Sequence, residues 1–173
     1  MGTTRRFCCW SIVAVFLSSS TALHAQSERL PVEVKGTLGY SLFPDNAALH
    51  HFVGGGSARF YFTRRLAFEP EFLYMYRDAS DQDFHLVPNI AFDLRSRGSR
   101  VQPYVVGGVG LELHRELTGV GPYTSKSWTF GGGLGTKFFL NDRWFVAPEA
   151  RLGWEPVLRI TANVGYVFSG RKR

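Results

Sequence analysis

The sequence is nearly free of cysteine and has no long apolar segment outside its N-terminal region. Its only cysteines are Cys8 and Cys9. After Leu17, no apolar run approaches the roughly 20 residues that a transmembrane helix requires. We therefore expect the rest of the chain to have no disulfide, no thiol chemistry and no membrane-spanning helix.

Signals for several functional classes are also missing. No segment has a helical period, and the glycine runs at 54–56 and 131–133 precede no helix, so neither is a phosphate-binding loop. The formal net charge is +6, but the basic residues gather in turns and a terminal tail. This distribution argues against a nucleic-acid-binding face. We expect no nucleic-acid partner and no cofactor.

The first 25 residues have the composition of an export signal. Arg5 and Arg6 precede an apolar stretch from Phe7 to Leu17, and small residues then lead to Ala25. The apolar stretch is too short to span a bilayer. We predict a signal peptide at residues 1–25 that is cleaved after Ala25, with Ala22 as the second choice. Both cysteines would leave with it.

The remaining sequence alternates large apolar residues with small or polar ones, the pattern of β-strands whose two faces have different environments. Eight runs show this period: Val32–Leu42, Phe52–Phe62, Leu66–Tyr76, Phe84–Leu94, Val101–Leu113, Ser127–Leu140, Trp144–Trp154 and Leu158–Phe168. Short turns are predicted at 63–65, 95–100 and 141–143, and longer loops at 43–51, 77–83 and 114–126. Even strand number and alternating connection lengths are typical of a transmembrane barrel.

The distribution of aromatic residues indicates which face is outside. Nearly all strand aromatics share the apolar face, whereas Tyr61, Tyr104, Phe139 and Phe145 lie on the other. An eight-stranded barrel is just wide enough for side chains to fill it, so the aromatic-rich face cannot point inward, as it would in a soluble lipocalin-like barrel. Aromatics near strand ends would form two girdles at the membrane boundaries. The girdle residues are Tyr74, Tyr76, Trp128, Trp154, Trp144, Tyr166 and Phe168.

We therefore predict an all-β fold, an eight-stranded antiparallel up-and-down transmembrane β-barrel at residues 26–168, followed by a basic tail at 169–173. Four prolines fall within strands, all on the lipid-facing side: Pro70, Pro88, Pro103 and Pro148. Each removes one hydrogen bond of the ladder, so we expect a bulge or weakened pairing beside each.

Several segments resemble the bacterial outer-membrane protein β-barrel family, in particular small eight-stranded barrels of the OmpA/OmpX type. They are residues 101–110 (VQPYVVGGVG), 130–135 (FGGGLG), 144–151 (WFVAPEAR) and 164–168 (VGYVF). The resemblance implies an integral protein in the outer membrane of a Gram-negative-type bacterium, with periplasmic termini. It also implies recognition of Phe168 by the barrel assembly machinery. From charge we expect contact with outer-membrane lipids and lipopolysaccharide: the short-turn end is basic and suits anionic phospholipid headgroups, and the long-loop end is acidic and suits bridging to lipopolysaccharide through divalent cations. We expect a monomer.

The predicted inner face carries nearly balanced charges. The site candidates among them are Arg59, Glu69, Glu71, Lys137, Glu149, Arg151 and Arg159. The turn lengths place Arg59 opposite Glu69, and Lys137 within side-chain reach of Glu149. Enclosed charges must be paired. They either form a polar plug or act as a gate in which pairs exchange partners to open a narrow ion path.

No catalytic residues and no metal site are predicted. Histidines and serines gather near the long-loop end: His50, His51, His85, His114, Ser41, Ser57, Ser80, Ser125 and Ser127. A divalent cation at a loop tip is the alternative, held either by His50 and His51 with Asp45 or by Asp78, Asp81, Asp83 and His85. The acidic run has no glycine of a calcium hand, and we interpret it as a solvated loop. We expect a non-enzymatic structural or interaction role, in membrane integrity or adhesion, or narrow porin-like permeation. The alternative is a lipid-modifying enzyme with a Ser/His site at the outer rim.

Overall fold

The computed structural model describes residues 30–43, 50–78, 81–95, 98–118, 121–154 and 157–168. The predicted signal peptide and the basic tail lie outside these residues. The strands are β1 (Val32–Leu42), β2 (His50–Tyr61), β3 (Leu66–Asp78), β4 (Asp81–Asp93), β5 (Val101–Thr118), β6 (Gly121–Phe139), β7 (Trp144–Gly153) and β8 (Val157–Val167). Among the described residues, no helix is long and apolar enough to cross a membrane.

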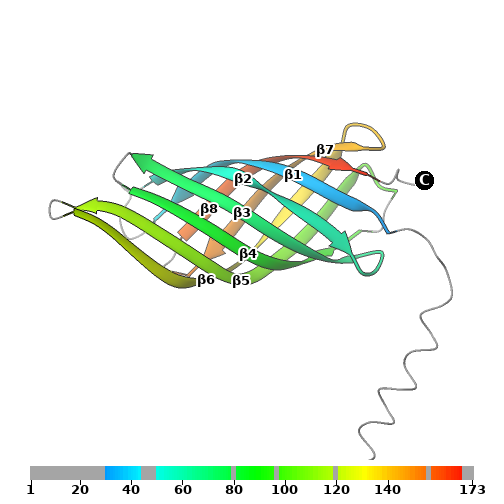
Figure 1. Cartoon of the computed structure of the whole chain (residues 1–173). Coiled ribbons are helices and arrows are strands. Elements are labelled where there is room, and N and C mark those ends of the chain that lie inside the picture. The colour runs from blue at the N-terminus through cyan, green and yellow to red at the C-terminus, as the bar shows by residue number, and fades with distance from the viewer. Residues whose placement is uncertain are drawn as a thin grey trace, which may run out of the picture.

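The eight strands form one closed barrel in which every strand pairs antiparallel with its sequence neighbours and β8 closes onto β1 (Figure 1). This confirms the predicted fold class. The short connections at 62–65 and 140–143, and residues 94–95 and 98–100 between β4 and β5, lie at one end, which we call the turn end. The opposite end, where β3 meets β4 and β5 meets β6, we call the hairpin end.

The hairpin end differs from the sequence prediction. Residues 77–83 and 114–126 were expected to be loops, but most of them continue the strands β3 to β6. β5 and β6 stay in register from Val101↔Phe138 to Thr118↔Gly121. In Figure 1 they project beyond the other strands.

The two faces divide as predicted. The aromatics assigned to the lipid side are exposed or half-buried, and Trp128 is 71% exposed. Tyr61, Tyr104 and Phe145 are buried in the lumen. Glycines make room for these rings, since a Cβ on Gly165 would collide with the ring of Phe145.

Three of the four strand prolines lie beside interruptions of a ladder. The β2–β3 pairing passes from Ser57↔Glu71 to Phe60↔Phe68, beside Pro70. The same kind of gap occurs between β4 and β5 beside Pro88, and between β6 and β7 beside Pro148. The register is unchanged across each gap, so these prolines weaken pairing without forming a bulge. Pro103 instead lies just beyond the end of the β4–β5 ladder, where its carbonyl accepts a hydrogen bond from Leu94 N.

Candidate functional site in the lumen

The first cluster of lumen charges lies toward the turn end and centres on Lys137 of β6. Its ammonium group donates hydrogen bonds to both carboxylate oxygens of Glu33, at 3.2 and 2.9 Å, and to the hydroxyl of Tyr61 at 2.7 Å. It also lies 3.3 Å from Asp93. Arg59 contacts the same aspartate at 3.3 Å. Two cations therefore face two carboxylates in a buried, balanced group.

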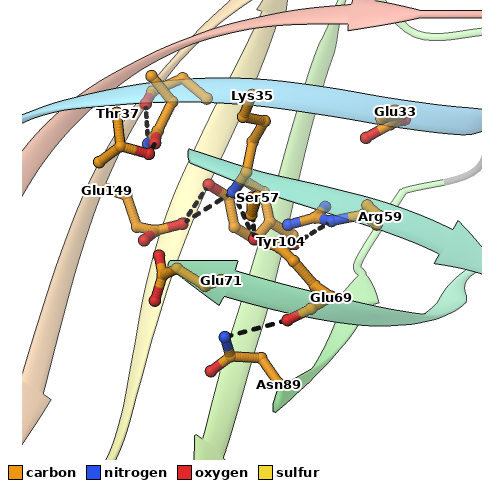
Figure 2. Close-up of polar contacts among 12 residues, drawn as sticks. Glu33, Lys35, Thr37, Ser57, Arg59, Glu69, Glu71, Asn89, Tyr104 and Glu149 are labelled. Atoms are coloured by element: carbon orange, nitrogen blue, oxygen red, sulfur yellow. Dashed lines mark hydrogen bonds and ion pairs between the residues drawn. The ribbon is translucent and has the colours of Figure 1, made fainter. Parts of the chain in front are cut away.

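The second cluster fills the middle of the barrel around Glu69 of β3. Lys35 Nζ lies 2.6 Å from Glu69 and 3.7 Å from Glu149. Figure 2 shows Lys35 reaching from β1 toward Glu149. Arg151 Nε donates to Glu149 at 2.6 Å, and another nitrogen of its guanidinium lies 3.8 Å from Glu69. Each of these two cations therefore contacts both carboxylates.

The network continues toward the hairpin end through Glu71. Its carboxylate accepts hydrogen bonds from Arg151 Nη1 and Arg159 Nη2, both at 3.0 Å. Asn89 Oδ1 accepts a further hydrogen bond from Arg151 at 3.1 Å. All four side chains are buried.

A contact between Arg59 and Glu69 joins the first cluster to the second. The sequence placed these two residues opposite each other, and the structure pairs them directly. Every candidate lumen residue named from the sequence belongs to the resulting network, which runs across strands β1 to β8. Removing one partner from such a network leaves a buried charge uncompensated, at a cost of about 3–5 kcal/mol.

One expected pair is not formed. Lys137 was predicted to reach Glu149, but it pairs with Glu33 and Asp93 instead. Tyr104 explains the difference. Its ring lies against Gly135, on the strand segment between the two residues, and its hydroxyl donates to Glu149 at 2.6 Å. The tyrosine therefore takes the place that the lysine would need.

A vestibule opens above the network, toward the hairpin end. Its floor includes Glu71, Arg151 and Arg159, and its walls include Met75, Val87 and Val157. Solvent at the hairpin end therefore meets the arginine–glutamate layer first. Below that layer, the lumen of the described barrel is filled by buried side chains.

A second polar group surrounds the mouth of this vestibule. His51 Nε2 on β2 lies 3.1 Å from Asp81 Oδ2 and 3.8 Å from Asp83 Oδ2, both on β4. His114 on β5 lies directly opposite Asp83 in the ladder, and its Nδ1 is 2.6 Å from Asp83 Oδ1. The pair His85 and Glu112 lies one ladder step further into the barrel, at 3.9 Å.

The sequence offered these residues only as two separate loop-tip sets and preferred a solvated loop, because it treated residues 77–83 as a loop and so did not bring His51 together with Asp81 and Asp83. Asp81, Asp83 and His85 alternate along β4, so all three side chains share the inner face. The signal was present in that period of two. It could have been recognised had the strand been extended past Phe84.

The predicted girdle residues lie near the two ends of the barrel wall. Tyr74 and Tyr76 stack at 6.2 Å between ring centroids, and Trp154 packs against Phe130 at 4.9 Å. At the turn end, Tyr166 contacts Trp144 at 5.0 Å and Phe168 at 5.3 Å. Their exposed or half-buried rings suit a membrane–water boundary.

Comparison with known proteins agrees with this architecture. The family model described as "Outer membrane protein beta-barrel domain" matches residues 11–168. No curated protein sequence matches the chain.

Three solved structures show the same fold. The N-terminal β-barrel domain of Pseudomonas aeruginosa OprF has 16% identity and a TM-score of 0.68, over 80% of this chain and 97% of that one. Neisserial surface protein A has 13% identity and a TM-score of 0.64, over 79% and 96%. Ail, the attachment invasion locus protein of Yersinia pestis, has 11% identity and a TM-score of 0.50, over 80% and 97%.

Proposed function

The chain belongs to the outer membrane protein β-barrel family, and from this premise we propose a structural and interaction role for a barrel with a closed lumen. The observation that carries the proposal is the buried ion-pair network from Glu33 to Arg159. It occupies the cross-section that a diffusing solute would need. An eight-stranded barrel is just wide enough for its own side chains.

A planar-bilayer recording tests the closed lumen. The wild-type protein should give no steady current. Glu69→Ala should produce current, because Glu69 holds Arg59, Lys35 and Arg151 together and its loss leaves these cations repelling one another. Glu116→Ala is the matched control, since that carboxylate is exposed at the hairpin end. A steady wild-type current as large as that of Glu69→Ala would contradict the proposal.

Gated permeation is a second candidate, and the shared partners favour it. Lys35 and Arg151 each contact both Glu69 and Glu149. Such a cation can exchange one carboxylate for the other without becoming unpaired. A gate predicts brief wild-type openings whose frequency changes in Arg59→Ala. If neither protein opens, the network acts as a plug only.

The interaction role is assigned to the hairpin end, which we propose faces outward, with the termini in the periplasm. β5 and β6 project furthest there. Two of the similar structures are called a surface protein and an attachment invasion locus protein, and similar adhesion is our proposal for this chain. The turn end carries exposed arginines that suit anionic phospholipid headgroups: Arg64, Arg65, Arg95, Arg100 and Arg143.

We further propose that Phe168, which directly follows β8, is recognised by the barrel assembly machinery. Phe168 N donates to Val32 O across the β1–β8 seam at 2.9 Å, and its side chain is exposed. Outer-membrane lipids and lipopolysaccharide would surround the monomeric barrel.

The enzymatic alternative is less well supported. Ser41 lies directly opposite His51 in the β1–β2 ladder, and His51 contacts Asp81, so the three residue types of a hydrolytic triad are adjacent. However, Ser41 is 0% exposed, and its hydroxyl has no hydrogen-bond partner in the described part of the chain. A lipid substrate could not reach it. Mass spectra of lipid A from cells with and without the protein should therefore be identical.

A further inference from the structure

We propose that the mouth of the lumen binds a divalent transition-metal ion of the zinc class, with His51, Asp81 and Asp83 as its ligands. These residues come from β2 and β4 and meet at the rim of the vestibule. The site is separate from the ion-pair network, and the proposal does not depend on whether that network conducts.

The ligand spacing fits one ion. One atom from each of the three residues lies within 4.8 Å of the others. His51 Nε2 lies 3.1 Å from Asp81 Oδ2 and 3.8 Å from Asp83 Oδ2. Nitrogen and oxygen ligands about 2.0–2.2 Å from zinc lie roughly 3.3–3.5 Å apart in a tetrahedral site. The observed separations lie on either side of that range, so small side-chain rotations would complete the geometry.

The surrounding residues provide the support that a metal ligand needs. His114 Nδ1 contacts Asp83 Oδ1 at 2.6 Å, which leaves Oδ2 to face His51. Metal-binding carboxylates are characteristically held by a hydrogen bond of this kind. His85 and Glu112 form a second triad with Asp83 on the vestibule side. Asp83 is therefore common to both possible ligand sets.

The rim group is largely buried, and its nearest cations apart from His51 are His114, 2.6 Å from Asp83 and 3.9 Å from Asp81, and Arg77. The side chain of His51 is only 5% exposed and that of Asp83 only 8%. Asp81 Oδ1 and His51 Nδ1 are buried without a hydrogen-bond partner among the described residues. Buried carboxylate oxygens normally accept hydrogen bonds or coordinate metals. The guanidinium of Arg77 lies 3.9 Å from Asp81, at the limit of an ion pair.

The donor atoms select the class of metal. Imidazole nitrogen suits zinc, copper, nickel and iron, whereas calcium and magnesium prefer all-oxygen sets. A histidine between two carboxylates, without sulfur, therefore favours zinc over the two alkaline-earth ions.

Titration calorimetry with zinc chloride tests the proposal. The full-length barrel would be purified in detergent from outer membranes and freed of metal with EDTA. We expect saturable zinc binding at one site. His51→Asn and Asp83→Asn should each weaken it by at least about tenfold, the lower end of the loss typical when a residue that supports a ligand is replaced. Band shifts on boiling would show that each variant is folded.

His50→Asn is the matched control, because His50 is the preceding residue on β2 but is exposed, on the opposite face from His51. Its zinc affinity should equal that of the wild type. Absence of wild-type binding, or equal affinities in folded His51→Asn and wild-type barrels, would overturn the proposal. Tighter binding of calcium than of zinc would overturn the assignment of the metal class.

Discussion

At the level of single residues, glycine and aromatic side chains together determine how the lumen is filled. Phe145 is fully buried, and its ring lies over Gly165 on the neighbouring strand β8. Tyr104 uses Gly135 in the same way and directs its hydroxyl to Glu149. At these two positions, the large ring fits into the narrow barrel because the paired residue on the neighbouring strand lacks a Cβ.

Gly165→Ala should destabilise the barrel by about 1–3 kcal/mol, because the new methyl group would overlap the ring of the fully buried Phe145. Urea unfolding of the protein in lipid vesicles, followed by tryptophan fluorescence, measures the change.

Gly36→Ala is the control for this experiment. A Cβ at Gly36 would meet nothing within 4 Å. Its effect should stay within about 0.5 kcal/mol, as for ordinary surface substitutions. Equal losses in both variants would mean that backbone flexibility, and not the aromatic contact, decides the effect.

At the level of the strands, the alternation of residue types along the sequence and the hydrogen-bond pairing between strands do not end at the same residues. The sequence indicated all eight strands because lipid on one side and a polar lumen on the other impose a period of two. That contrast is lost toward the hairpin ends of β5 and β6, where the described side chains on both faces are exposed or half-buried. Hydrogen-bond pairing nevertheless continues to Thr118↔Gly121. The ends of the strands were therefore the part that the pattern could not predict.

The lumen contacts show a similar limit. A short turn fixes the register between neighbouring strands, so the sequence could place Arg59 opposite Glu69. Lys137 instead pairs with Glu33, which lies 104 positions earlier in the chain. That pair forms across the closed barrel, and its geometry depends on the Tyr104 ring. No pattern along a single strand contains this information.

The extended part of the β5–β6 hairpin should be dispensable for folding. Removing residues 116–123 and joining Arg115 to Thr124 through Asn-Gly keeps the remaining register, because these two residues already face each other. None of the removed side chains that the structure describes belongs to the ion-pair network. The shortened protein should still show a band shift on boiling. Loss of the folded band would mean that the hairpin tip nucleates the barrel.

At the level of the whole molecule, the two ends of the barrel differ. The hairpin end projects further, and the turn end carries exposed arginines. This difference predicts how the barrel is oriented in the membrane. Because the only cysteines lie in the predicted signal peptide, single cysteines can report each end without background. Tyr123→Cys places a thiol at an exposed position on the projecting hairpin, and Asp142→Cys places one in a turn at the other end.

A membrane-impermeant maleimide applied to intact cells should label Tyr123→Cys and leave Asp142→Cys unlabelled. After the outer membrane is permeabilised, both should react to a similar extent, which shows that the turn is accessible. Labelling of Asp142→Cys alone in intact cells would reverse the orientation and place the histidine–aspartate rim in the periplasm.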